Sequence, residues 1–288
     1  MTPDKYSAVW VSHTSINDFL QCPRAYYLKH VYKDPKTGHK IKVMTPPLAL
    51  GQAVHEVIEQ MSTLPTQDRF KKIPMARYEE VWKKISGKLG GFLNDNVEDS
   101  YKRRGREMIS MITKHPGPIA EKAVKIHESL PHYWLSEDAN IILCGKVDWL
   151  QYLPETDSIH IIDFKTGKSN ESDSSLQLPI YLLLVSNTQK RTVSKVSYWY
   201  IARQEDLEEQ KLPNEKDAYE KVLDVARRIK TARQLEQFSC PDGGCRACAP
   251  MERVLNGEGE FVGLDEYRTD IYVLPTKEVD EESQSTIL

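Results

Sequence analysis

The sequence predicts an α/β fold in which helices flank a central sheet. Helical and strand-like patterns alternate along the chain: several helices come first, then a β-hairpin, a helix, a further strand and more helix. The helices before the hairpin indicate a helical insertion in the N-terminal half. Three cysteines within nine residues mark a cysteine-rich segment, residues 239–250, near the C-terminus.

Composition and charge narrow the class of protein. The chain has 288 residues, of which 40% are hydrophobic and 28% charged, as in an ordinary globular protein. We expect a single domain over residues 1–275 and a disordered acidic tail over residues 276–288. No apolar run is long enough for a membrane span and no signal peptide is evident, so we expect a cytoplasmic protein without a membrane partner. The net charge of −3 does not exclude a local basic groove.

The N-terminal third is predicted to be helical. We expect a helix to begin at Ser15, with Asp18 completing a capping box, and to end near Cys22. Pro23 can open a second short helix. Prolines and a glycine indicate a loop over residues 33–47. The helices that follow are expected over residues 48–62, 75–95 and 100–114, and residues 65–120 form the insertion.

The hairpin lies in the middle of the chain. Strands are expected over residues 140–153 and 158–166, because Pro154-Glu155-Thr156-Asp157 has turn chemistry. The elements expected after it are a helix over residues 175–186, a strand over residues 192–202 and a long polar helix over residues 214–238.

Two aspartates should face each other on this hairpin. Asp148 and Asp163 are equally distant from the centre of the turn, so they should form a directly opposed pair about 4.5–5.5 Å apart. Two carboxylates at that distance repel each other unless a cation such as Mg²⁺ or Mn²⁺ lies between them. Lys165 points to the same face as Asp163, and a lysine beside a metal site suits phosphodiester hydrolysis. The alternative is a surface charge pair, which the apolar residues flanking Asp163 disfavour.

Three other polar residues fall at helical spacing. His55 shares a helix face with Gly51, and it is either a metal ligand or simply a packed or surface residue. Gln177 and Tyr181 share a face of a later helix, with Gln177 at its N-terminal end, where phosphate binds favourably. A core tyrosine beside a capping glutamine is the competing interpretation.

These segments, in this order, resemble the RecB-type branch of the PD-(D/E)XK nuclease superfamily. The matching stretches are SHTSINDFLQCPRAYY from Ser12, GQAVH from Gly51, GKVD from Gly145, IDFKTG from Ile162 and QLPIY from Gln177. The resemblance implies a restriction-endonuclease-like core with a central mixed sheet. It also implies a Mg²⁺ or Mn²⁺ ion bound by His55, Asp148, Asp163 and the carbonyl of Phe164. The catalytic set would be Asp148, Asp163, Lys165, Gln177 and Tyr181.

The same branch, which includes AddB-like and CRISPR-adaptation nucleases, often carries a [4Fe–4S] cluster. The resemblance assigns it to Cys22, Cys240, Cys245 and Cys248. Here the isolated cysteine of the C-terminal group comes first, whereas the branch commonly places it last. Zinc bound by four thiolates and plain thiols are the alternatives. Cys144 is expected to be a packed thiol.

The resulting expectation is a metal-dependent DNA exonuclease acting on single strands or DNA ends in repair, recombination or CRISPR adaptation. No G-x4-G-K-[ST] helicase motif occurs, so a helicase or a CRISPR integrase is a possible protein partner. The alternatives are a catalytically silent DNA-binding or scaffolding subunit and an RNA nuclease. The basic residues of the insertion either contact DNA or form a solvated face. They are Lys71, Lys72, Lys83, Lys84, Lys102, Arg103, Arg104 and Arg106.

Overall fold

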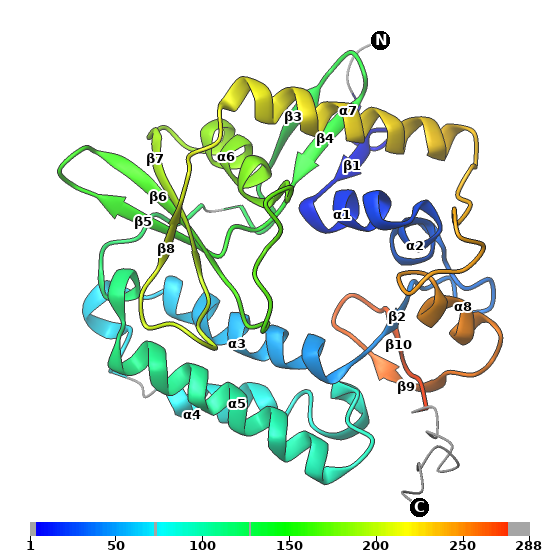
Figure 1. The fold of residues 1–288 in the computed structure, drawn as a ribbon, viewed down its shortest axis with the longest axis horizontal. Helices are drawn as coiled ribbons and strands as arrows, with labels where there is room; N and C mark the ends of the chain where they lie inside the picture. The colour runs from blue at the N-terminus through cyan, green and yellow to red at the C-terminus, as the bar shows by residue number, and fades with distance from the viewer. Residues whose placement is uncertain (1–3, 72–73, 127, 276–288) are drawn as a thin grey trace, which may run out of the picture.

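The computed structural model describes residues 4–71, 74–126 and 128–275. A mixed sheet lies between helical layers, and a smaller group of strands and a helix brings residues 41–43 beside the segment 249–273 (Figure 1). The predicted α/β class is therefore confirmed. The expected tail, residues 276–288, and Lys72 of the basic insertion lie outside the described residues. Among the described residues, no helix has both the length and the apolar character that crossing a membrane requires.

The principal sheet has four strands in the order β5-β6-β7-β8. β6 pairs antiparallel with β5 and parallel with β7, and β7 pairs antiparallel with β8, so the sheet is mixed. Every residue of β6 is buried, because helices cover both faces of this central strand. The strands are β5 Trp149–Leu153, β6 Ser158–Phe164, β7 Val193–Trp199 and β8 Glu208–Gln210.

The single long strand expected over residues 140–153 is wrong. It is divided into β4, Ile141–Cys144, and β5, and the residues between them have no strand pairing. β4 belongs to a second sheet, between β1, Val9–Val11, and β3, His132–Ser136. The break falls at Gly145, where an added Cβ would lie 3.2 Å from a methyl group of Leu184, so a side chain there would crowd the adjacent helix.

Two helical layers enclose the principal sheet (Figure 1). One layer packs against the Ile162 and Phe164 face of β6, and the other packs against its Ile159 and Ile161 face. The first layer consists of α3 Pro46–Ser62, α4 Pro74–Trp82 and α5 Asp95–Lys114. The second consists of α1 His13–Gln21, α6 Gln177–Thr188 and α7 Glu215–Gln234.

Helices α1 and α5 begin earlier than predicted, because each is capped by a residue upstream of its expected start. α1 is capped by Ser12, whose hydroxyl accepts a hydrogen bond from the N–H of Ser15, while the Ser15 hydroxyl accepts one from the N–H of Ser12. The expected box of Ser15 and Asp18 is therefore wrong, and Asp18 instead binds Lys29 and His30.

The expected helix over residues 75–95 is also wrong, because α4 ends at Trp82 and a short 3₁₀ helix, Gly87–Gly90, follows. α5 begins at Asp95, where the Asn94 side chain accepts a hydrogen bond from the N–H of Val97 at 2.9 Å. Two more 3₁₀ helices, Thr66–Asp68 and Gly117–Ala120, complete the insertion.

A third sheet joins a strand from the N-terminal third of the chain to two strands near residue 270. β2, Ile41–Val43, lies in the region expected to be a loop, and it pairs in parallel with β10, Asp270–Val273. β9, Glu260–Leu264, pairs with the other edge of β10. Near this sheet lie α2 Pro23–Tyr26, a π-helical turn Tyr27–Val31 and α8 Ala249–Leu255.

Candidate active site

The turn between β5 and β6 sets the register that the sequence predicts. Trp149 pairs with Ile162 and Leu150 with Ile161, so one further step in the same register brings Asp148 opposite Asp163. Asp148 lies just outside the ladder. Its Oδ2 accepts a hydrogen bond from the N–H of Phe164 at 3.0 Å, which holds its carboxylate against the end of β6.

Asp163 is a buried carboxylate with one unsatisfied oxygen. Its Oδ1 accepts a hydrogen bond from Nε2 of Gln177 at 2.7 Å. Its Oδ2 lies 3.0 Å from Nζ of Lys165, but this ion pair lacks hydrogen-bond geometry, and Oδ2 accepts no hydrogen bond from any described residue. Burial, and then the charge of Asp148, raise the pKa of Asp163 to about 7. A cation beside these two carboxylates would remove that repulsion.

His55 extends the acidic pair from α3. Its Nδ1 lies 3.3 Å from Oδ2 of Asp148. Burial lowers the pKa of His55, but the neighbouring Asp148 carboxylate outweighs it and brings this pKa to about 9. Burial also opposes the charged form of Asp148, yet His55 and the N–H of Phe164 lower its pKa overall. The α3 helix thus places an imidazole against the acids.

Lys165, Gln177 and Tyr181 form a connected network. Lys165 donates a hydrogen bond to Oε1 of Gln177, whose Nε2 also lies 3.1 Å from the hydroxyl of Tyr181. Gln177 is the first residue of α6, as expected, and it is buried. Its amide therefore faces Asp163 and Lys165 rather than open solvent. Burial opposes the charge of Lys165, but Asp163 and Glu171 outweigh it and raise its pKa.

Two residues of this site were missed in the sequence. Glu171, in the polar loop before α6, lies with Oε2 at 2.7 Å from Nζ of Lys165. His13 begins α1, and burial followed by the charge of Lys165 lowers its pKa to about 4. Glu171 stands among serines and other polar residues without a periodic pattern, so no signal distinguishes it. His13 lies in the stretch from Ser12 that carries the family resemblance, but that resemblance assigns no role to this residue.

A cleft of about 860 Å³ opens beside Asp148 and His55. One wall is α3, and the other includes the backbone around Ala123, which bridges to Gln151 at the edge of β5. A second hollow adjoins it and shares Lys125. Asp148 and His55 therefore border a groove that continues past the edge of β5.

The sequence profile of the PD-(D/E)XK nuclease superfamily matches residues 10–253, more than half of the chain. The chain belongs to the PD-(D/E)XK nuclease superfamily. No curated protein matches it. The matched range includes Asp163-Phe164-Lys165, His55, Asp148, Gln177 and Tyr181.

The residues around the end of β6 have donor atoms of the kind that bind a divalent cation. The Oδ2 of Asp163 and the Asp148 carboxylate are suitable oxygen donors, and the His55 imidazole is a suitable nitrogen donor once a cation displaces its proton. The backbone carbonyl of Phe164 is the fourth donor that the resemblance implies. A bound cation would activate water and stabilise negative charge on a phosphate.

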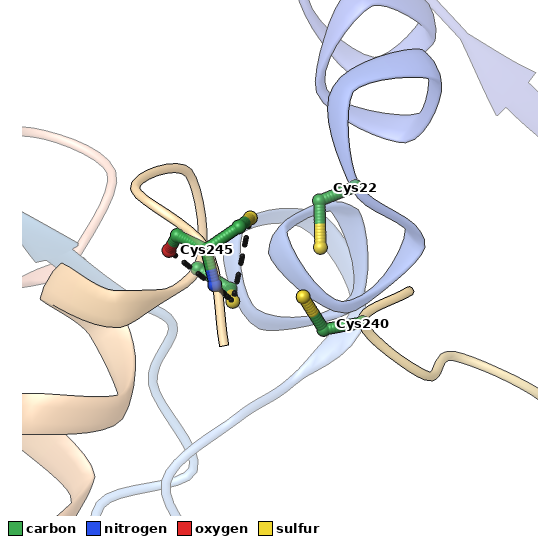
Figure 2. A group of neighbouring side chains, drawn as sticks. Cys22, Cys240 and Cys245 are labelled. Atoms are coloured by element: carbon green, nitrogen blue, oxygen red, sulfur yellow. Dashed lines mark hydrogen bonds between the residues drawn. The ribbon is translucent and has the colours of Figure 1, made fainter. Parts of the chain in front are cut away.

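The four cysteines named by the resemblance come together just beyond the C-terminal end of α1. Cys22 lies between α1 and α2, and the other three precede α8 (Figure 2). Their sulfur atoms all lie within 4.8 Å of one another. Hydrogen bonds from the N–H groups of Cys248 and Ala247 lower the pKa of Cys245 to about 7. This group is a candidate metal centre.

The spacing of the sulfurs bears on which centre fits. A tetrahedral zinc site with Zn–S bonds of about 2.3 Å separates its thiolates by roughly 3.8 Å. The Sγ atoms of Cys245 and Cys248 are 3.7 Å apart. A [4Fe–4S] cluster uses the same four thiolates and requires the sulfurs to spread further. Cys144 lies apart in β4, with its thiol 3.4 Å from the carbonyl of Val11.

Proposed function

We propose that the protein is a Mg²⁺- or Mn²⁺-dependent deoxyribonuclease. The observation that carries this proposal is the contact network in which one buried amide, Gln177, bridges Asp163 and Lys165 beside a second carboxylate, Asp148. Such an arrangement places two carboxylates and a fixed ammonium together at the end of β6. Phosphodiester hydrolysis needs both, because charge on the phosphate grows as water attacks.

The proposed roles follow from the contacts. His55, Asp148, Asp163 and the Phe164 carbonyl would hold the cation. Lys165 would face the phosphate and stabilise its charge. Gln177 would orient Lys165 and Asp163, and Tyr181 would support Gln177 from the next turn of α6.

We further propose that the substrate is single-stranded DNA or a DNA end, attacked as by an exonuclease. The cleft beside Asp148 lies between α3 and the sheet edge, and its volume of about 860 Å³ suits a few nucleotides rather than a duplex. Unwinding would then come from a partner, such as a helicase or a CRISPR integrase. Repair, recombination and CRISPR adaptation all use such nucleases.

Substitution of Asp163 tests the activity. Asp163→Asn keeps the size of the side chain and should abolish Mn²⁺-dependent cleavage of labelled DNA, with an unchanged circular dichroism spectrum. Asp206→Asn removes an exposed acid from the loop between β7 and β8 and should leave cleavage intact. Full activity of Asp163→Asn would reject the assigned centre. DNA substrates labelled at the 5′ or the 3′ end would show the direction of cleavage, and matched RNA substrates would show whether the enzyme prefers DNA or RNA.

A catalytically silent DNA-binding subunit is the alternative. Silent relatives are expected to lose an acid or the lysine, whereas here Asp148, Asp163 and Lys165 are all present and in contact through Gln177 and Phe164. Binding of DNA without cleavage by the unsubstituted protein, in either Mg²⁺ or Mn²⁺, would favour this alternative.

We also propose that Cys22, Cys240, Cys245 and Cys248 bind a metal centre, a [4Fe–4S] cluster by resemblance or a zinc ion by sulfur spacing. Protein purified without oxygen would decide between them. Iron with an absorbance band near ~400 nm identifies the cluster. A colourless protein with one zinc ion identifies the zinc site, and a metal-free protein would reject both.

A further inference from the structure

We propose that Glu171 is a positioning residue that fixes the ammonium of Lys165 for its role beside the phosphate. This inference rests on the proposed nuclease function. Glu171 lies outside every motif that carries the resemblance, in the loop between β6 and α6. Its Oε2 lies 2.7 Å from Nζ of Lys165, a distance typical of a close ion pair.

Three side-chain oxygen atoms surround the ammonium of Lys165. They belong to Asp163, Gln177 and Glu171. Gln177 accepts a hydrogen bond from this ammonium, and the two carboxylates form ion pairs with it at 3.0 Å and 2.7 Å. The ring of Tyr198 lies on a further side, with its centre 4.9 Å from Nζ. The lysine therefore has little freedom to change its rotamer.

The contribution of Glu171 would matter most with a cation at the site. Asp163 would then be a ligand, and its Oδ2 already lacks hydrogen-bond geometry toward Lys165. Gln177 is neutral. Glu171 would therefore be the negatively charged partner left to hold the ammonium of Lys165 in place.

Glu171 is itself held in place through its neighbours. Its backbone N–H donates a hydrogen bond to the hydroxyl of Tyr200 at 3.0 Å, and Tyr200 is buried at the end of β7. The preceding residue, Asn170, accepts a hydrogen bond from Arg203 at 2.6 Å, and the Arg203 guanidinium lies over the ring of Tyr200. The loop is thus anchored on the sheet beside Lys165, which distinguishes Glu171 from a freely moving surface acid.

Kinetics of matched variants test this role. Glu171→Gln should lower kcat roughly ten-fold with little change in KM, because a poorly oriented group costs rate rather than binding. Glu171→Ala should lower it further, and Glu171→Asp should recover part of the loss. Asp173→Asn removes the same charge from the same loop without a contact to Lys165, so its kcat should equal that of the unsubstituted protein.

Two kinetic results would overturn the proposal. The first is a Glu171→Gln variant as active as Asp173→Asn. The second is a variant with lower KM or higher kcat, which would mean that Glu171 competes with the phosphate for Lys165.

A measurement without turnover separates this inference from the nuclease proposal. Acetylation of lysines with limiting reagent, followed by mass spectrometry, reports how freely each amine reacts. Lys165 should react several-fold faster in Glu171→Gln than in Asp173→Asn, since the ion pair shields its amine. Equal labelling of Lys165 in the two variants would reject the Glu171–Lys165 contact, even if the protein cleaves DNA. Faster labelling in Glu171→Gln, in a protein that cleaves no DNA, would support the contact and reject the nuclease function.

Discussion

Gln177 joins Asp163 to the rest of the site through a hydrogen bond of 2.7 Å from its Nε2 to Oδ1 of the carboxylate. The same amide accepts a hydrogen bond from Lys165 through its oxygen. Since an amide can donate on one side and accept on the other, Gln177 satisfies an acid and a base at once. Without Gln177, the Asp163 carboxylate and the Lys165 ammonium would each lose a hydrogen bond in an apolar interior.

Gln177→Met should therefore harm both stability and rate. Methionine fills a similar volume but leaves the buried Asp163 oxygen and the Lys165 amine without their partner, so we expect a loss of about 1–3 kcal/mol. Urea denaturation measures the loss, and nuclease kinetics should show a lower kcat. Leu178→Met is the matched control on the same helix, with a cost expected below ~1.5 kcal/mol. Equal stability of the two variants would contradict the role of Gln177.

His160 predicts acid sensitivity of the folded state. This buried histidine of β6 has its ring nitrogens 2.9 Å from Gln151 and 2.7 Å from Ser197, both neutral. Burial, and then the charge of Lys195, lower its pKa to about 4. Because the folded pKa lies below the unfolded value, the stability that His160 contributes is present above about pH 6.5 and is lost as the pH falls toward 4.

The loss from His160 should reach about 2 kcal/mol between pH 7 and pH 5. Urea denaturation across this range measures it, and His160→Gln should flatten the pH dependence even if it lowers stability overall. His115→Gln removes a half-exposed histidine and should leave the slope unchanged. An unaltered slope in His160→Gln would assign the acid sensitivity to other groups.

A metal bound by the cysteine group should connect Cys22, between α1 and α2, to the segment that precedes α8. Cys240→Ser should release the metal centre and lower Tm by about 5–10 °C, and limited proteolysis should begin within residues 239–250. Cys144→Ser is the control, because Cys144 lies in β4 away from the group. Its metal content should equal that of the unsubstituted protein. Full metal content in Cys240→Ser would remove this cysteine from the set.

The groove beside the site predicts how DNA binds. Lys122 and Lys125 are exposed, line the adjoining hollows and form no ion pair within the described part of the chain. Lys122→Glu combined with Lys125→Glu should weaken single-stranded DNA binding and reduce its salt slope by about 0.7 for each phosphate that is no longer neutralised. Lys221→Glu on α7 should leave binding unchanged. Fluorescence anisotropy at several salt concentrations makes the comparison, and equal slopes would place the DNA elsewhere.

The hairpin shows what the sequence could predict. A short polar turn fixes the pairing of the strands on either side, so the register of Trp149 with Ile162 follows from local chemistry alone. The division of the first strand does not. The break falls where Gly145 lies close to Leu184, and this proximity joins residues far apart in the sequence.

The third sheet and the role of Glu171 could not be predicted from the sequence, because both depend on contacts between distant segments. β2 is three residues long and pairs with β10 across most of the chain, so no local pattern marks it. Glu171 depends on where its loop folds back over Tyr200. The polar residues around it resemble those of any solvated loop.

The parallel pairing of β2 with β10 also sets an order of events during synthesis. Ile41–Val43 leave the ribosome well before Asp270–Val273 do, and at ~5–20 residues per second the separation amounts to a delay of tens of seconds. Through that delay Cys22 also lacks its three partners from the C-terminal segment. The nascent chain can therefore assemble its principal sheet early, while the pairing of β2 waits until Asp270–Val273 have been synthesised.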